Sequence, residues 1–210
     1  MTKAEELYTG DEGAQYWERN GDRLRRESID RQRALRSLIP DEIIRDRQWL
    51  EVGCGRGDNL CYHDVGLDCD PRQLDAMIRW YYYGKIAVLG HAYDLSMFID
   101  GSFEVVFSVG CLMHLPTRRL VPGVISPGTW WNEDIEDETW QRAVEEMARV
   151  SRRYVILGEY WAEQEEPVEG KHWEGCLWRR PYNVPGFRLV KGESLEPFDA
   201  DVLFTVWQKV

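Results

Sequence analysis

The segment WLEVGCGRGDNL, residues 49–60, contains residue types that could hold a nucleotide-like ligand. Three glycines, Gly53, Gly55 and Gly57, follow an apolar stretch with the spacing G-x-G-x-G, and an acid, Glu51, precedes them. Such a loop lets bare backbone pass close to a ligand, because no Cβ atom stands in the way. Dinucleotide-binding loops have the wider spacing G-x-G-x-x-G. The tighter spacing therefore favours another ligand, and a plain strand-to-helix turn is the alternative.

Three more segments with polar residues follow the glycine loop: VGLDCDP at 65–71, LGHAYDL at 89–95 and DGSFEVVFSVGCLMHLP at 100–116. Each begins with or contains an apolar run that predicts a strand. Asp68 comes at the end of its run, where a carboxylate can either bind a ligand or act as a strand-end cap. Asp70 precedes Pro71 and is expected to cap the next helix.

Together and in this order, the four segments resemble the class I S-adenosylmethionine (SAM) methyltransferases. The resemblance implies that Asp68 accepts hydrogen bonds from both ribose hydroxyls. It also implies an adenine-binding loop, in which His91 stands where the family commonly has an acid, and the amide of Ala92 or the carboxylate of Asp94 could take over that contact. The implied cofactor-binding set is Glu51, Gly53, Gly55, Gly57, Asp68, Cys69, His91, Ala92, Ser108 and Val109.

A narrower resemblance covers both ends of the chain. Residues 9–20, TGDEGAQYWERN, and residues 154–182 are similar to the methyltransferase family associated with pseudaminic acid biosynthesis. This resemblance implies a small-molecule acceptor, a sugar or nucleotide-sugar with a hydroxyl or amine to be methylated.

Methyl transfer to a hydroxyl needs a general base within hydrogen-bond reach. His114, which follows the fourth predicted strand and titrates in a suitable range, is the first candidate. A histidine there could instead cap or buttress the loop. His172 and Glu159 are the next candidates.

Two other segments are expected on the substrate side. Residues 116–137 form an insertion after the fourth strand, and its Trp130 and Trp131 could close over an acceptor or simply pack on the body. Residues 1–40 form a flap and a helix, with Tyr16, Trp17, Arg19 and Asn20 expected over the pocket. An aromatic staple on the sheet edge is the alternative for these residues.

The elements that must position these residues alternate along the chain. Strands are predicted near 48–53, 64–68, 85–90, 102–110, 152–161, 187–194 and 201–210, and helices at 22–38, 71–83 and 138–150. This alternation predicts one α/β domain over residues 1–210, with a mostly parallel Rossmann-like sheet. The methyltransferase resemblance implies the strand order 3-2-1-4-5-7-6, with an antiparallel strand near the end. Only ten residues, 58–67, separate Gly57 from Asp68, so the first crossover helix must be cut to about one turn.

Composition limits the partners. The formal net charge of −11 disfavours a nucleic-acid substrate, although a basic groove around Arg23, Arg25 and Arg26 would suit RNA or protein. The N-terminal residues have no apolar signal segment and no stretch is long enough to span a membrane, so we expect a cytoplasmic protein. Cys54, Cys61, His63 and Cys69 match no standard zinc spacing, so no metal site is expected. A SAM-fold protein that binds without turnover is a further alternative, and the oligomeric state is not predicted.

Overall fold

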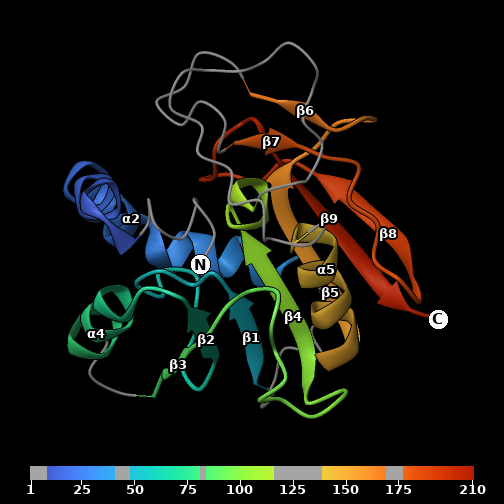
Figure 1. Cartoon of the computed structure of the whole chain (residues 1–210), viewed down its shortest axis with the longest axis horizontal. Coiled ribbons are helices and arrows are strands. Elements are labelled where there is room, and N and C mark those ends of the chain that lie inside the picture. The colour runs from blue at the N-terminus through green and yellow to red at the C-terminus, as the bar shows by residue number, and fades with distance from the viewer. Residues whose placement is uncertain (1–8, 41–47, 81–83, 116–138, 169–176) are drawn as a thin grey trace, which may run out of the picture.

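Seven strands form one sheet in the order β3-β2-β1-β4-β5-β9-β8, as Figure 1 shows from left to right. The computed structural model describes residues 9–40, 48–80, 84–115, 139–168 and 177–210. The seven strands are β1 (Trp49–Val52), β2 (Val65–Asp68), β3 (Ile86–Leu89), β4 (Phe103–Val109), β5 (Ser151–Tyr160), β8 (Phe187–Glu193) and β9 (Val202–Lys209). Strands β1 to β5 pair in parallel, and β9 is antiparallel to both β5 and β8. The predicted order 3-2-1-4-5-7-6 is therefore confirmed, with the last two strands renumbered.

Both faces of the central strands are buried, because helices cover each side. The side chains of Leu50 and Val52 belong to one core cluster with α5 (Thr139–Val150), whereas Trp49 belongs to another with α2 (Asp11–Arg36) and α4 (Pro71–Trp80). Successive side chains of a strand point to opposite faces. Glu51, two residues after Trp49, therefore points to the face that α2 and α4 cover.

Helix α2 is longer than the sequence predicted. It begins at Asp11, not at residue 22, and ends at Arg36. Its buried positions, Gly21, Leu24, Ser28 and Leu35, keep helical spacing. Ile29 is 61% exposed, because a residue five positions after Leu24 falls off that face.

The connection between β1 and β2 consists of turns and contains no helix. The sequence predicted a crossover helix cut to about one turn, so the shortening is greater than expected. Helix α2 packs on this connection instead. The Ser28 hydroxyl donates to the Asp58 carbonyl at 2.7 Å, and Arg31 Nε donates to Asn59 Oδ1 at 2.8 Å. Near the end of α2, Arg36 pairs with the buried Asp64 carboxylate. The side chains of α2 therefore hold a loop that would otherwise have no helix to support it.

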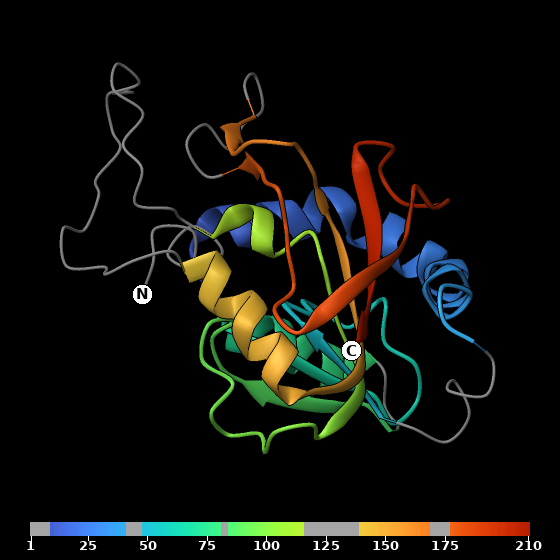
Figure 2. The same cartoon turned by 90° about the vertical axis from the view of Figure 1, so that its right-hand side faces the viewer.

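A short antiparallel ribbon of β6 (Glu166–Pro167) and β7 (Trp178–Arg179) was not predicted. In Figures 1 and 2 it lies beyond the carboxyl end of β4, on the same side as the one-turn 3₁₀ helix η1 (Leu112–His114). The predicted insertion at 116–137 and the last residues of the helix predicted at 71–83 lie outside the described residues.

Candidate functional site

The glycine loop after β1 has a backbone that other residues could not adopt. Gly53, Gly55 and Gly57 have φ angles of 76°, 52° and 75°, in the left-handed region that favours glycine. A Cβ atom on Gly53 would lie 2.4 Å from the side chain of Cys111, and one on Gly55 would lie 2.7 Å from the Trp17 ring. The loop is therefore fixed by backbone conformation and by close neighbours at once.

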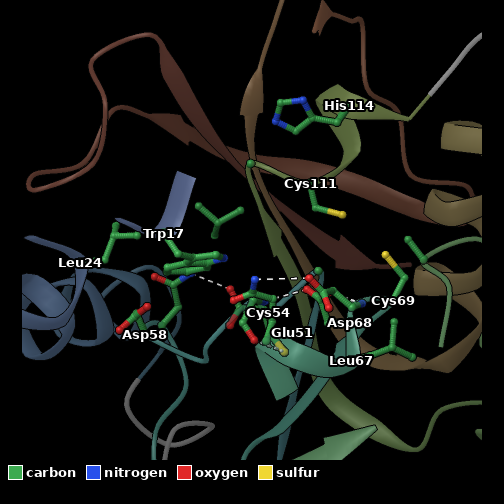
Figure 3. A pocket seen from close by; sticks show the side chains of 18 of the residues that line it. Trp17, Leu24, Glu51, Cys54, Asp58, Leu67, Asp68, Cys69, Cys111 and His114 are labelled. Carbon is green, nitrogen blue, oxygen red and sulfur yellow. Dashed lines mark hydrogen bonds between the residues drawn. The ribbon is translucent and has the colours of Figure 1, made fainter. Parts of the chain in front are cut away.

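A cavity of about 210 Å³ opens beside this loop at the carboxyl ends of the parallel strands (Figure 3). Its walls come from α2, the glycine loop, the ends of β2 and β3 and the turn after β4. The lining residues used below are Trp17, Arg31, Glu51, Gly53, Cys54, Gly55, Asn59, Leu67, Asp68, Cys69, Asp70, Gly90, Ala92, Val109, Cys111 and His114. Ligands of open α/β sheets bind at this edge.

Glu51 places a carboxylate in the wall of the cavity with no exposure to solvent. Asn59 Nδ2 donates to its Oε1 at 2.6 Å, and Arg31 donates to the other end of the same amide. The Oε2 atom accepts no hydrogen bond from any described residue. Burial raises the pKa of Glu51 to about 8, although Asn59 and Arg31 lower it in part. A cationic or N–H donor in the cavity would satisfy this oxygen.

Asp68 lies at the end of β2, as predicted, and lines the cavity. Its two carboxylate oxygens accept the amides of Gly55 at 2.8 Å and Asp70 at 2.9 Å. Each oxygen has a second lone pair that can accept from a ligand. Burial raises the pKa of Asp68 to about 6, while these amides lower it in part. The residue both fixes the glycine loop and presents acceptors to the cavity.

Asp70 has a different role, although it also lines the cavity. Its Oδ1 accepts the Arg72 amide at 2.9 Å in the first turn of α4, and its Oδ2 pairs with the Arg72 guanidinium. Burial raises the pKa of Asp70, but the hydrogen bonds from Arg72 outweigh that effect and lower it. The expected helix cap is confirmed.

The loop after β3 contributes Gly90 and Ala92 to the cavity, beside Leu67 and Cys69 of the neighbouring strand end. His91 is not among the lining residues; its ring stacks on Tyr93 with centroids 5.3 Å apart. Asp94 accepts the Ser96 amide at 3.2 Å and caps its own turn. The geometry therefore supports the Ala92 backbone, and neither of the two titratable side chains, as the ligand contact.

Of the residues at the end of β4, Val109 lines the cavity, whereas Ser108 is buried and its hydroxyl donates to Glu159 Oε1 at 2.8 Å. Cys111 and His114 line the cavity from the turn that follows. Figure 3 shows His114 above Cys111, with Glu51 and Asp68 below it. The predicted site residues from strand four are thus brought to the cavity, except for Ser108.

The assignment of Glu159 as a candidate general base is not supported. Its side chain is 1% exposed and does not line the cavity. Besides Ser108, it accepts the amides of Cys111, Leu112 and Met113, each at 3.1 Å. Burial raises its pKa and these four hydrogen bonds lower it. A carboxylate occupied in this way supports the turn and cannot receive a proton from an acceptor in the cavity.

The N-terminal residues enter the site through α2. Trp17 lies against Gly55, and the Arg56 guanidinium lies 4.7 Å from the centroid of its ring. Asn20 does not line the cavity. Tyr16 belongs to α2 by its backbone, but its side chain lies outside the description, as do Trp130, Trp131 and His172.

Sequence reasoning missed Arg31, Asn59 and Cys54 as lining residues. Asn59 stands only two positions after the last loop glycine, so its proximity could have been inferred. Arg31 could not, because nothing in the sequence indicates which face of α2 lies on the loop. Among the described residues, no group of three or more His, Cys, Asp or Glu side chains is arranged to hold a metal ion.

Comparison with known proteins identifies the family. Residues 50–157 match the model of the methyltransferase domain family. No curated protein matches the chain. No helix in the described part of the chain is both long and apolar enough to cross a lipid bilayer.

Solved structures share the fold at low sequence identity. A SAM-dependent methyltransferase from Thermotoga maritima, described as a possible histamine N-methyltransferase, covers 97% of this chain and 100% of its own at 15% identity, with a TM-score of 0.61. Magnesium protoporphyrin IX methyltransferase from Synechocystis, with bound SAH, covers 97% of both chains at 12% identity, with a TM-score of 0.62. A match to the YcgJ protein from Bacillus subtilis covers 55% of this chain and 45% of that protein at 17% identity, with a TM-score of 0.42.

The buried Glu51 carboxyl predicts a pH-dependent stability. Its pKa is about 8 in the folded protein and 4.5 in an ordinary setting. Between these values the unfolded chain loses the proton first, so the free energy of unfolding falls as pH rises, by about 1.4 kcal/mol per pH unit. We expect Glu51→Gln to lack this part of the fall in urea titrations between pH 5 and 8. The exposed Glu145→Gln serves as control, and parallel pH profiles of Glu51→Gln and wild type would contradict the prediction.

Proposed function

Since the chain belongs to the methyltransferase domain family and is a SAM-dependent methyltransferase, we propose that it methylates a small-molecule acceptor, a sugar-like or nucleotide-sugar hydroxyl or amine. The observation that carries the proposal is the cavity itself. At one end it is lined by the glycine loop with Glu51 and Asp68, and at the other by the turn that contains His114. The resemblance of residues 9–20 and 154–182 to the pseudaminic acid-associated family supports the sugar-like acceptor.

The cavity fits SAM on two observations. Glu51 Oε2 is a buried acceptor without a hydrogen bond from the described residues, and the methionine end of SAM carries an ammonium group that would donate to it. The glycine loop has the positive φ angles and absent side chains that let a ligand lie against its backbone. Beyond these, Arg31 would offer its charge to the carboxylate of the same methionine end, and Asp68 would accept from the ribose hydroxyls.

When bound, SAM supplies a methyl group already activated on a sulfonium, so the protein has little covalent chemistry to perform. The chain's own residues hold and orient the acceptor and exclude water. His114 would accept the proton of an acceptor hydroxyl, because it lines the cavity at the turn after β4. Trp130 and Trp131, in the 116–137 insertion, remain proposed acceptor contacts, and His172 remains the second candidate base.

The charges on α2 favour a small molecule over RNA or protein. A phosphate backbone would need a basic groove, for which Arg23, Arg25 and Arg26 were the candidates. Arg25 instead pairs with Asp22 at 2.7 Å, and Arg23 lies 3.5 Å from Glu27. With acids interleaved among these arginines and a net charge of −11, this part of α2 does not offer the single-sign field that phosphates require.

A screen tests the acceptor class. The purified protein is incubated with SAM and, in separate arms, with nucleotide-sugars, free sugars, total RNA or denatured protein. Mass spectrometry then follows demethylated SAM and methylated product. We expect product in a sugar-containing arm, abolished by the His114→Asn substitution. Product in the RNA or protein arm alone would overturn the proposal.

Asp68 and Asp70 provide a matched pair for the cofactor site. We expect Asp68→Ala to weaken SAH binding by roughly 1.5–3 kcal/mol, because a charge-assisted contact to the ribose is lost. Asp70→Ala should mainly remove the cap of α4 and lower the free energy of unfolding by about 1 kcal/mol. Calorimetric titration with SAH and urea unfolding on both variants check this. Equal SAH affinities of the two variants would show that Asp68 does not hold the ribose.

His114→Asn tests the proposed base. With an acceptor from the screen, the single-turnover rate should fall by about 10²–10⁴-fold, the usual worth of a general base, while the SAH affinity stays close to that of the wild type. If turnover is undiminished, or if SAH binding is lost in step with thermal stability, His114 is structural and His172 becomes the candidate.

A further inference from the structure

The turn after β4 carries four cavity residues, Gly110, Cys111, His114 and Leu115, on very little regular structure. Its only helical element is η1, a single 3₁₀ turn of three residues. Such a turn has few internal hydrogen bonds, and an isolated helical turn is unfavourable because its ordering costs more than it returns. The position of this turn must therefore be set by groups outside it.

A buried carboxylate holds the beginning of the turn. Glu159, near the end of β5, accepts the amides of Cys111, Leu112 and Met113 at 3.1 Å each. These are the backbone donors that a helix leaves unsatisfied at its N-terminal end, where negative charge is favourable.

A buried guanidinium holds the end of the turn. Arg180, which has no exposed surface, donates through Nη1 to the Leu112 carbonyl and through Nη2 to the Leu115 carbonyl. Its Nε pairs with Glu165 at 3.2 Å. The rings of Trp140 and Trp178 lie 5.4 and 5.7 Å from the guanidinium carbon, so the charge is enclosed by aromatic surface.

The two charged residues share one anchor. Glu159 belongs to β5, and the Arg180 amide donates to the carbonyl of the next β5 residue, Tyr160, at 3.1 Å. Burying two charges is costly unless each is well paired. Both charges are paired here, and their directional contacts impose a geometry on the turn that apolar side chains could not. That geometry matters here because the side chain of Cys111 fills the space where Gly53 would carry a Cβ atom.

We infer that Glu159 and Arg180 are positioning residues that hold the turn at both ends and thereby fix His114 relative to the glycine loop. The inference rests on the proposed function in that it treats this turn as the acceptor side of the site. Glu159→Gln replaces an acceptor oxygen with a donor that faces backbone amides. Arg180→Lys keeps the charge but cannot reach both carbonyls as a planar fork does.

The opposite end of the sheet offers matched controls. Glu104, in β4, is 4% exposed and pairs with Arg152 at 2.9 Å and Arg153 at 3.1 Å. Arg149 donates to two carbonyls, of Phe98 at 3.0 Å and Leu95 at 2.9 Å, as Arg180 does in the turn. Glu104→Gln therefore perturbs a buried carboxylate, as Glu159→Gln does, and Arg149→Lys perturbs a guanidinium bonded to two carbonyls, as Arg180→Lys does. Both control positions lie away from the cavity.

The test uses the whole protein and needs no acceptor. Side-chain carbon–proton NMR resolves the four histidines, with His114 identified by the signal missing from His114→Asn. We expect all four variants to lower the Tm. Only Glu159→Gln and Arg180→Lys should shift the His114 signal and raise hydrogen exchange of the Cys111, Leu112 and Met113 amides, by about tenfold or more.

A His114 signal and exchange rates in Glu159→Gln equal to those in Glu104→Gln would overturn the inference. If Arg180→Lys does not fold, Glu159→Gln decides alone. This outcome can be told apart from the outcome for the proposed function. Full turnover by His114→Asn would contradict the assignment of His114 as the base but would leave the spectroscopic result unaffected. A His114 signal that does not shift in Glu159→Gln would contradict the positioning role but would leave the assignment of His114 as the base unaffected.

Discussion

The buried carboxylate of Glu51 is the constraint around which the site is arranged. Strand β1 carries it into the face between the sheet and α2, with no exposed surface and one oxygen without a hydrogen bond from the described residues. Burying an acid in this way costs free energy, which its pKa of about 8 expresses. The surrounding groups, Asn59 bonded to Glu51 and Arg31 bonded to Asn59, reduce that cost without removing it. The free oxygen faces a cavity in which a ligand can complete its bonding.

Helix α2 follows from the same constraint. The connection between β1 and β2 is too short for a crossover helix, so the loop that contains Asn59 would lie open to water. The side chains of Ser28, Arg31 and Arg36 bond this loop, and α2 thereby closes the face on which Glu51 lies. The shortened connection is therefore supported by a helix that precedes the glycine loop in the chain.

Sequence was sufficient for the sheet and for the backbone part of the site. The alternation of strands and helices, together with the family resemblance, predicted the strand order. The glycine spacing and the position of Asp68 at a strand end predicted the part of the cavity wall that these residues form. Three expected residues do not line the cavity: Ser108 and His91, which the family resemblance implied, and Glu159, which ends a predicted strand. Whether such a side chain faces a ligand or the neighbouring backbone depends on packing between distant segments, as the contact of Glu159 with the 111–113 amides shows. The start of α2 was missed because residues 11–21 lack an apolar stripe that would mark a helix.

Proton release on ligand binding tests the central role of Glu51 most directly. At pH 6.5 the free carboxyl is largely protonated, and the ammonium group of SAH is fully charged because α-amino groups titrate near 7.7–8.0. Calorimetric titrations with SAH in two buffers of different ionisation enthalpy count the protons exchanged. The account predicts a release approaching about one proton per site in the wild type, as Glu51 ionises to meet the ammonium. It predicts a much smaller release in Glu51→Gln, where the Asp68 carboxyl, with a pKa of about 6, still titrates near this pH. Equal proton counts for the two proteins would contradict it.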